Sequence, residues 1–339
     1  MENYIFENEG HQVAQGRWTP IITSRGCPFG CTFCASRKTK FIGRDPMDVV
    51  DEIDHCLETY GIKEFHFEDD NFTIQRKRVV GICEEIIRRK LNIVWSTPNG
   101  IRASVTDKEL LTLMKKSGCD SIVLAPESGS RRVLDEIVQK GKSHDLDQLC
   151  QVAKDASGLG LKVSAYFVLG MPGETTSDII QTINYACRLA KNGVTEVGFG
   201  LFIPLPGTPL WDQVKREKIR EIDFLDYLSI SNLGQAQSWS RFISDQELYY
   251  LRAYGYKKFF ITKTIYNPKT IFITLRNILS ENATTKSETR IVSLLKKYRN
   301  KRNNRNSWGE HVSSKIFVNF YYLVFYVVPL VFLGRARDK

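Results

Sequence analysis

The chain has 339 residues, of which 42% are hydrophobic and 25% are charged, so it can bury a full core and has the composition of an ordinary globular protein. Its net charge of +10 is unevenly distributed along the chain. Residues 251–339 carry 18 Lys and Arg against 4 Asp and Glu, whereas residues 1–250 carry 30 Lys and Arg against 34 Asp and Glu. The basic part is therefore the C-terminal end, which argues against a main domain that binds nucleic acid.

Residues 1–17 are a short polar lead-in without the basic and then apolar pattern of a secretory signal. The chain has eight cysteines, three of them close together and the others scattered singly, which indicates a reducing, cytoplasmic environment and not a disulfide framework. We expect the single cysteines to be buried as small apolar side chains. These are Cys56, Cys83, Cys119, Cys150 and Cys187.

From residue 20 to residue 206, β-rich runs alternate with amphipathic stretches of helical length. The predicted strands are 20–24, 64–69, 93–97, 121–125, 162–169 and 196–203. The predicted helices between them are 46–60, 76–90, 107–116, 146–158 and 175–191. Strands that alternate with helices in this way predict a parallel sheet, since parallel neighbours need crossover helices.

Two α/β architectures fit this alternation, an open doubly wound sheet and a partial barrel. The glycine-rich phosphate loop of a dinucleotide-binding fold does not follow the first predicted strand, where a cysteine loop stands instead. We therefore predict a partial (β/α)6 TIM-like barrel over residues 18–215, with its site at the carboxyl ends of the strands.

The cysteine loop carries Cys27, Cys31 and Cys34 in the spacing C-x-x-x-C-x-x-C, directly after an apolar run. Thiolates are soft ligands for iron or zinc. A structural zinc site usually needs four ligands, and a ferredoxin cluster is held by four cysteines. Three cysteines around a four-iron cluster would leave one iron open for another ligand. The alternatives are a small zinc knuckle or three buried cysteines.

Charged or glycine-rich turns follow five of the predicted strands. They are residues 68–71, 98–102, 126–130, 170–174 and 204–209. Because the carboxyl ends of parallel strands meet at one edge of a barrel, we expect these turns to converge on one site. Each turn alone could equally be a helix cap or an ordinary turn.

The cysteine loop, with the aromatic Phe33 directly before Cys34, resembles the signature loop of the radical S-adenosylmethionine (SAM) enzymes. In that family the three cysteines hold a [4Fe-4S] cluster, and the fourth iron chelates SAM. An electron from an external donor of the flavodoxin or ferredoxin kind cleaves SAM to a 5′-deoxyadenosyl radical. The resemblance implies both cofactors, with Cys27, Cys31 and Cys34 as the metal ligands.

The resemblance extends to the turns and implies their contacts with SAM. Asp69, Asp70 and Asn71 resemble the acidic turn near the methionine amino group. Glu127 and Ser128 resemble the turn that contacts the ribose.

The turn with Gly170, Gly173 and Glu174 is similar to the family's glycine-rich element beside the adenine. Phe33 would contribute backbone contacts to the adenine. Arg102 could pair with a carboxylate of SAM or of the substrate, or it could form a surface salt bridge.

The residues in these motifs resemble those of the radical SAM subgroup that usually carries a cobalamin-binding domain. The resemblance covers about residues 18–215. That domain normally precedes the cysteine loop, and only about 25 residues do so here. We therefore expect direct hydrogen abstraction from a substrate. The alternatives are a methyltransferase that takes cobalamin from a separate protein and a non-catalytic iron–sulfur protein.

After the barrel we expect a helical extension over 216–281, a basic linker over 282–315 and an apolar segment over 316–334. Residues 316–333 carry no formal charge and would span about 27 Å as a helix, close to the ~30 Å of a membrane's hydrocarbon core. This segment is a candidate membrane anchor, while Pro329 and its short length also fit a shallow anchor or a buried helix. We thus expect attachment to the inner face of the cell membrane, a small-molecule or lipid-linked substrate, and no nucleic-acid partner.

Overall fold

The computed structural model describes residues 17–141, 144–222 and 236–281, with short stretches between 283 and 296. The chain divides into two compact units, Met1–Asn267 and Pro268–Lys339. The first unit holds the sheet and every residue of the candidate site. The described part of the second unit consists mainly of α8 (Lys269–Leu279).

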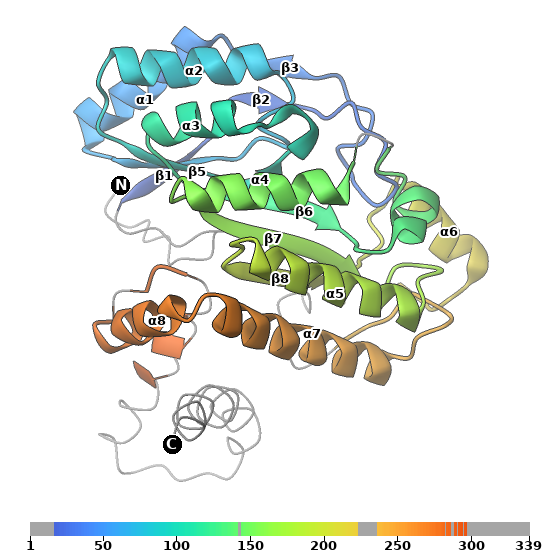
Figure 1. Ribbon diagram of the computed structural model, residues 1–339. Coiled ribbons are helices and arrows are strands. Elements are labelled where there is room, and N and C mark those ends of the chain that lie inside the picture. Colours follow the sequence, from blue (N-terminus) through green and yellow to red (C-terminus); the bar gives the residue numbers. More distant parts are fainter. Residues whose placement is uncertain are drawn as a thin grey trace, which may run out of the picture. The chain divides into compact units, whose positions relative to one another are not determined.

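The first unit is built on a six-stranded parallel sheet in which the strands stand side by side in chain order (Figure 1). They are β1 (Trp18–Ile21), β4 (Glu64–Phe67), β5 (Val94–Ile101), β6 (Cys119–Glu127), β7 (Lys162–Leu169) and β8 (Glu196–Leu201). Each helical crossover therefore returns beside the strand that it left. This singly wound order is that of a partial (β/α)6 barrel, whereas a doubly wound sheet would reverse direction, so the predicted fold class is confirmed.

Five helices connect these strands and lie along one side of the sheet (Figure 1). They are α1 (Pro46–Tyr60), α2 (Arg76–Arg88), α3 (Lys108–Lys116), α4 (Leu146–Gly158) and α5 (Thr176–Lys191). Side chains cap four of these helices: the side chain of Asp45, for example, accepts a hydrogen bond at the start of α1, and Thr175 and Asp178 form a reciprocal capping box at the start of α5. The capped backbone amides fix where these four helices begin, whereas α2 follows Gln75 without a side-chain cap.

The two faces of the sheet differ in chemistry because side chains alternate along each strand. On β7, Val163, Ala165, Phe167 and Leu169 are buried in the main hydrophobic core with the helices. The alternate residues of the strand face the other side of the sheet, which is the inner face of the barrel. On β4, His66 lies between Phe65 and Phe67, which join the main core, and its ring stacks on Trp18 at a centroid distance of 4.4 Å. The inner face is therefore the more polar one.

Helix α7 (Asp245–Tyr266) protects the open edge of the sheet at β8. The guanidinium Nε of Arg252 donates to the carbonyl oxygen of Phe199 at 2.9 Å, and the amide of Phe199 donates to the hydroxyl of Tyr256 at 3.1 Å. An edge strand otherwise leaves such groups without partners. Since the first compact unit extends to Asn267, α7 belongs to the same unit as the barrel.

Three features were not foreseen from the sequence. A small antiparallel sheet of β2 (Ser24–Arg25) and β3 (Ile42–Gly43) brackets the cysteine loop. A π-helix (Val133–Ile137) follows β6, and α6 (Pro209–Glu217) follows β8.

Most of the predicted basic linker and the whole candidate anchor 316–334 lie outside the described residues. Within the part of the chain that is described, no helix is long and apolar enough to cross a membrane.

Candidate active site

The three clustered cysteines lie on one closed loop between β2 and β3. The amide of Cys34 donates to the carbonyl oxygen of Cys31 at 3.2 Å, and the amide of Thr39 donates to the carbonyl oxygen of Cys27 at 3.0 Å. In return, the amide of Cys27 donates to the hydroxyl of Thr39 at 2.8 Å. The loop is therefore held by its own backbone, with all three cysteines partly buried.

The three thiols influence one another's protonation. Burial raises the pKa of Cys27, Cys31 and Cys34, because the charged thiolate loses hydration, and the neighbouring thiols raise it further. Within the described residues, no group of three or more Cys, His, Asp or Glu side chains is arranged to hold a single metal ion.

Asp69, directly after β4, fastens the start of the cysteine loop to the sheet. One carboxylate oxygen accepts the amides of Thr23 and Ser24 at 2.6 and 3.1 Å, and the other accepts their hydroxyls at 2.5 and 2.6 Å. Arg78 lies 3.2 Å from the second oxygen, and both of these charged side chains are almost fully buried. Both oxygens of Asp69 are thus engaged by the protein, and they position the start of the cysteine loop. The predicted contact of Asp69 with the SAM amino group stays a prediction.

Asp70 points the other way and bridges the two ends of the cysteine loop. Its carboxylate accepts the amide of Gly26 at 2.9 Å and the hydroxyl of Ser36 at 2.5 Å, and it remains exposed. Its charge contributes to raising the pKa of Cys27 and Cys34. Asn71 accepts the amide of Thr73 at 3.3 Å, which closes the turn after β4.

Glu127 ends β6 with a left-handed backbone (φ 65°), a conformation that is strained for a residue with a side chain. Lys140 holds it: the ammonium lies 2.5 Å from the Glu127 carboxylate and 2.8 Å from the carbonyl oxygen of Ala125. After burial, Lys140 has the largest effect on the Cys31 thiol, and it lowers the pKa of that thiol. Ser128, the other predicted ribose residue, is buried and bonded to the hydroxyl of Thr182 at 2.9 Å.

The middle of the cysteine loop is fastened to the π-helix segment. The amide and the hydroxyl of Thr32 donate to the carbonyl oxygens of Val138 and Ile137 at 3.0 and 2.5 Å. Phe33 packs against a second apolar cluster that includes Met171 and Trp239. This cluster gathers the π-helix, α6 and the ends of β7 and β8 around the loop, and π-helical turns occur often at functional sites.

Arg102, which follows β5, lies against the opposite side of the loop. It is only 7% exposed, so it is not a surface residue, and its guanidinium stacks 3.5 Å from the ring centroid of Phe29. Its charge lowers the pKa of Cys27 and Cys31, although burial has the larger effect on both thiols. Arg102 and Lys140 thus bring two cations to the thiols.

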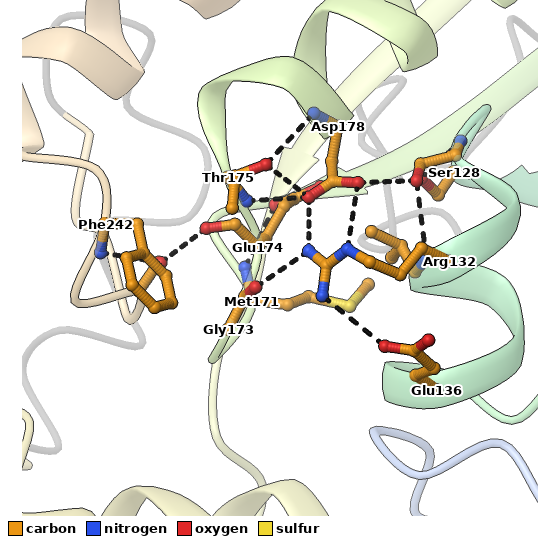
Figure 2. Close-up of polar contacts among 12 residues, drawn as sticks. Ser128, Arg132, Glu136, Met171, Gly173, Glu174, Thr175, Asp178 and Phe242 are labelled. Carbon is orange, nitrogen blue, oxygen red and sulfur yellow. Dashed lines mark hydrogen bonds and ion pairs between the residues drawn. The ribbon is translucent and has the colours of Figure 1, made fainter.

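The glycine-rich turn after β7 is organised around Glu174 (Figure 2). One carboxylate oxygen of Glu174 accepts the amides of Gly170 and Met171 at 2.6 and 3.2 Å, while the other is buried without a partner in the described residues. Burial raises the pKa of Glu174 to about 8, because the charged carboxylate loses its hydration. The carbonyl oxygen of Gly173 accepts a hydrogen bond from Arg132 at 2.9 Å, and Arg132 pairs with Asp178.

Gly170 has a left-handed backbone (φ 81°), and a β-carbon there would lie 2.7 Å from a methyl group of Leu248 on α7. A side chain would therefore push the turn away from the helix. This close approach explains a glycine at this position.

Residues 21–186 match the radical SAM superfamily, and the matched stretch contains the cysteine loop and the turns after β4, β5, β6 and β7. The chain belongs to the radical SAM superfamily. Members of this superfamily bind a [4Fe-4S] cluster and SAM and need an electron donor and a substrate.

Three curated relatives illustrate the range of this radical SAM group. An uncharacterized methyltransferase of Pyrococcus horikoshii is 33% identical over 57% of this chain and 41% of its own length. Cytidylyl-2-hydroxyethylphosphonate methyltransferase of Streptomyces wedmorensis is 34% identical over 65% of this chain and 41% of its own length. The anaerobic magnesium-protoporphyrin IX monomethyl ester cyclase of Rubrivivax gelatinosus is 27% identical over 77% of this chain and 45% of its own length.

The matches span less than half the length of these relatives. Among solved structures, the radical SAM methyltransferase TsrM of Kitasatospora setae, which was determined with cobalamin and a [4Fe-4S] cluster, has a TM-score of 0.53 at 20% identity. The similarity covers 60% of this chain and 37% of TsrM, and it shows a shared fold.

Several contacts of this radical SAM site could not be found from the sequence. Lys140 pairs with Glu127 across 13 positions, and Thr32 reaches Ile137 across 105 positions. No local motif predicts either pairing. The only hint for Arg78 is that a buried carboxylate such as Asp69 needs a nearby cation.

The Asp69→Asn variant should lose about 3 kcal/mol of unfolding free energy, because it leaves Arg78 buried without its counter-charge. Urea denaturation measures this loss. The matched control is Asp70→Asn, which changes the same group at an exposed position and should cost about 1 kcal/mol or less. Equal losses for the two variants would contradict the positioning role of Asp69.

Glu174 should make stability depend on pH. Its pKa is about 8 in the folded state against an ordinary 4.5, so between these values the folded state keeps a proton that the unfolded state has released. Stability from this group is therefore full below pH 4.5 and is lost as the pH rises towards 8.

The Glu174→Gln variant mimics the protonated acid. Relative to the wild type it should be equally stable near pH 4.5 and more stable near pH 8.5, by on the order of 3 kcal/mol. Denaturation curves at both pH values test this, and a difference that does not change with pH would contradict it.

Proposed function

We propose that Cys27, Cys31 and Cys34 hold the [4Fe-4S] cluster and that SAM binds beside it at the carboxyl edge of the barrel. When bound, this pair supplies reductive cleavage of SAM and thus a radical that attacks a substrate. The supporting observation is the closed cysteine loop, which places three partly buried thiols next to the turns of four strands. Three local ligands leave one iron of such a cluster for SAM.

The charge around the loop suits an anionic cluster. Three thiolates need nearby cations, because burial alone keeps these thiols protonated. Arg102 and Lys140 supply positive charge to Cys31, and Arg102 also supplies it to Cys27. The apolar cluster around Phe33 keeps water away from the same loop. We therefore assign Arg102 and Lys140 to charge compensation.

The contacts with SAM follow from the groups that the protein leaves available. Glu174 has one buried oxygen without a partner among the described residues, and the amides and carbonyls of its turn lie beside it. Asp70 is exposed beside the loop, where it would contact the methionine amino group of SAM. Glu127 can reach a ribose hydroxyl once it shares or exchanges its bond to Lys140. Asp69 and Ser128 hold the turns in place.

The inner face of the barrel favours a substrate with a polar part. His66 and Ser96 are cross-strand neighbours on β4 and β5, and both are buried. In the described part of the chain, Nδ1 of His66 and the hydroxyl of Ser96 have no hydrogen-bond partner. Since Nε2 of His66 lies 3.3 Å from the Glu64 carboxylate, its Nδ1 is left as an acceptor in the neutral ring. A hydroxyl or N–H group of a substrate would satisfy both residues.

The reaction that follows SAM cleavage is hydrogen abstraction from this substrate or methyl transfer. The names of the relatives favour methyl transfer as the second candidate, since two of them are methyltransferases, one is a cyclase, and TsrM was solved with cobalamin. Cobalamin would then be a further ligand of the whole protein. Tight binding of added cobalamin by the reconstituted chain would favour the methyltransferase.

The Cys31→Ala variant should lose the cluster and form no 5′-deoxyadenosine above background when the anaerobic protein receives dithionite and SAM. The matched control is Cys56→Ala, which removes a half-buried thiol of α1 and should keep about four irons per chain and full 5′-deoxyadenosine formation. Iron analysis measures the iron content of each variant, and chromatography measures its 5′-deoxyadenosine. A wild-type chain that holds iron and forms no deoxyadenosine would instead favour a non-catalytic iron–sulfur protein.

The proposal also includes attachment to the membrane through residues 316–334. A lipid-linked substrate would go with this attachment. It rests on the uncharged apolar run and the basic residues before it. Deleting residues 310–339 should move the protein from the membrane fraction to the supernatant after cell lysis. An unchanged distribution would exclude this anchor.

A further inference from the structure

Exposed basic side chains lie along the outer side of the cysteine loop, and one exposed acid from outside the loop, Asp70, contacts it at Gly26 and Ser36. From Gly26 to Arg44 the sequence contains four Lys and Arg residues and no Asp or Glu. Arg44 pairs with Glu52 at 2.5 Å, whereas Arg25, Lys38 and Lys40 are exposed and form no ion pair in the described part of the chain. We call these three residues the basic rim.

The basic rim surrounds an apolar side chain on the small sheet. Arg25 on β2 lies opposite Ile42 on β3, and Ile42 is 60% exposed. Charged residues around an exposed apolar residue are typical of a protein–protein contact surface, in which the apolar centre gives affinity and the charges give orientation. The acids at the start of α1, Asp45 and Asp48, bound the surface on one side.

Backbone hydrogen bonds connect this surface directly to the residues that carry the thiols. The amide of Lys38 donates to the carbonyl oxygen of Phe29 at 2.8 Å, and the amide of Thr39 donates to that of Cys27 at 3.0 Å. The contact is tight, since a β-carbon at Gly26 would come within 2.2 Å of the carbonyl oxygen of Lys40. One layer of backbone therefore separates the basic rim from Cys27.

The charge of the rim contrasts with that of the rest of the domain. The first 250 residues carry 30 Lys and Arg against 34 Asp and Glu, so a positive patch beside the thiols is not a property of the whole surface. An acidic partner would be attracted to this patch and turned towards the cluster.

We infer that Arg25, Lys38, Lys40 and Ile42 form the docking surface for an acidic one-electron carrier protein. The inference rests on the proposed cluster of Cys27, Cys31 and Cys34. In the reaction, one electron passes from the carrier to the cluster, so the carrier is oxidised and the cluster is reduced, with no bond made or broken. Binding at the basic rim would bring the carrier close to the cluster and so shorten the distance of electron transfer.

The test compares a protein donor with a small one. The reconstituted full chain is reduced either by flavodoxin, kept reduced by its reductase and NADPH, or by saturating dithionite. Loss of the cluster's visible absorbance gives the rate of reduction, and 5′-deoxyadenosine gives the yield. The variant is Lys38→Glu/Lys40→Glu. The matched control is Lys116→Glu/Lys154→Glu, which reverses two exposed lysines on α3 and α4.

At low salt, reduction by flavodoxin should be at least about 10-fold slower in the rim variant than in the wild type and the control, and added salt should shrink this difference. With dithionite, all three proteins should be reduced and form deoxyadenosine alike. Equal rates with flavodoxin, or an equal loss in the control, would overturn the docking surface.

The outcome separates this inference from the proposed function. Because the absorbance reports reduction without SAM cleavage, a chain that is reduced but forms no deoxyadenosine contradicts the proposed reaction and leaves the docking result readable. If the double variant does not retain its cluster, Arg25→Glu replaces it with the same expected outcome. In either case the wild-type rate with flavodoxin should fall as salt is added, and a rate independent of salt would overturn the inference.

Discussion

The buried carboxylate of Asp69 is the contact on which the geometry of the site depends. It takes hydrogen bonds from both backbone and side chains of Thr23 and Ser24, and Arg78 supplies its counter-charge. These bonds join the end of β4 to the strand that leads into the cysteine loop. Burying an ion pair is costly unless its remaining hydrogen bonds are satisfied, and here the loop itself satisfies them. The loop is therefore positioned by the barrel before any cofactor arrives.

The other side of the loop is held by different means. Thr32 bonds to the carbonyl oxygens at the end of the π-helix, and Phe33 enters an apolar cluster with Met171 and Trp239. Arg102 follows β5, and Lys140 contacts the end of β6; both bring positive charge to the partly buried thiol of Cys31. Thiolates can hold an anionic cluster where their loop is held rigidly, where apolar side chains exclude water and where cations lie nearby. The same elements carry the turns that surround the place for SAM.

The sequence was informative where the chemistry is local. Alternating strands and helices predicted the parallel sheet, because parallel neighbours need crossovers, and the six strands occur in the predicted order. The spacing of Cys27, Cys31 and Cys34 pointed to the cluster. The sequence could not distinguish the roles of Asp69 and Asp70, which are adjacent. The side chain of Asp69 is buried against Thr23, whereas that of Asp70 is exposed and contacts Gly26 of the cysteine loop. Lys140 was missed because its partner Glu127 is set by a strained turn and not by a motif.

The central claim is that the three-cysteine loop leaves one iron to which SAM binds. Electron paramagnetic resonance of the reduced, reconstituted full chain, recorded with and without SAM, tests it most directly. We expect a [4Fe-4S]⁺ signal whose g-values shift when SAM is added, because SAM would become a ligand of the open iron. Identical spectra from protein that holds about four irons per chain would contradict it.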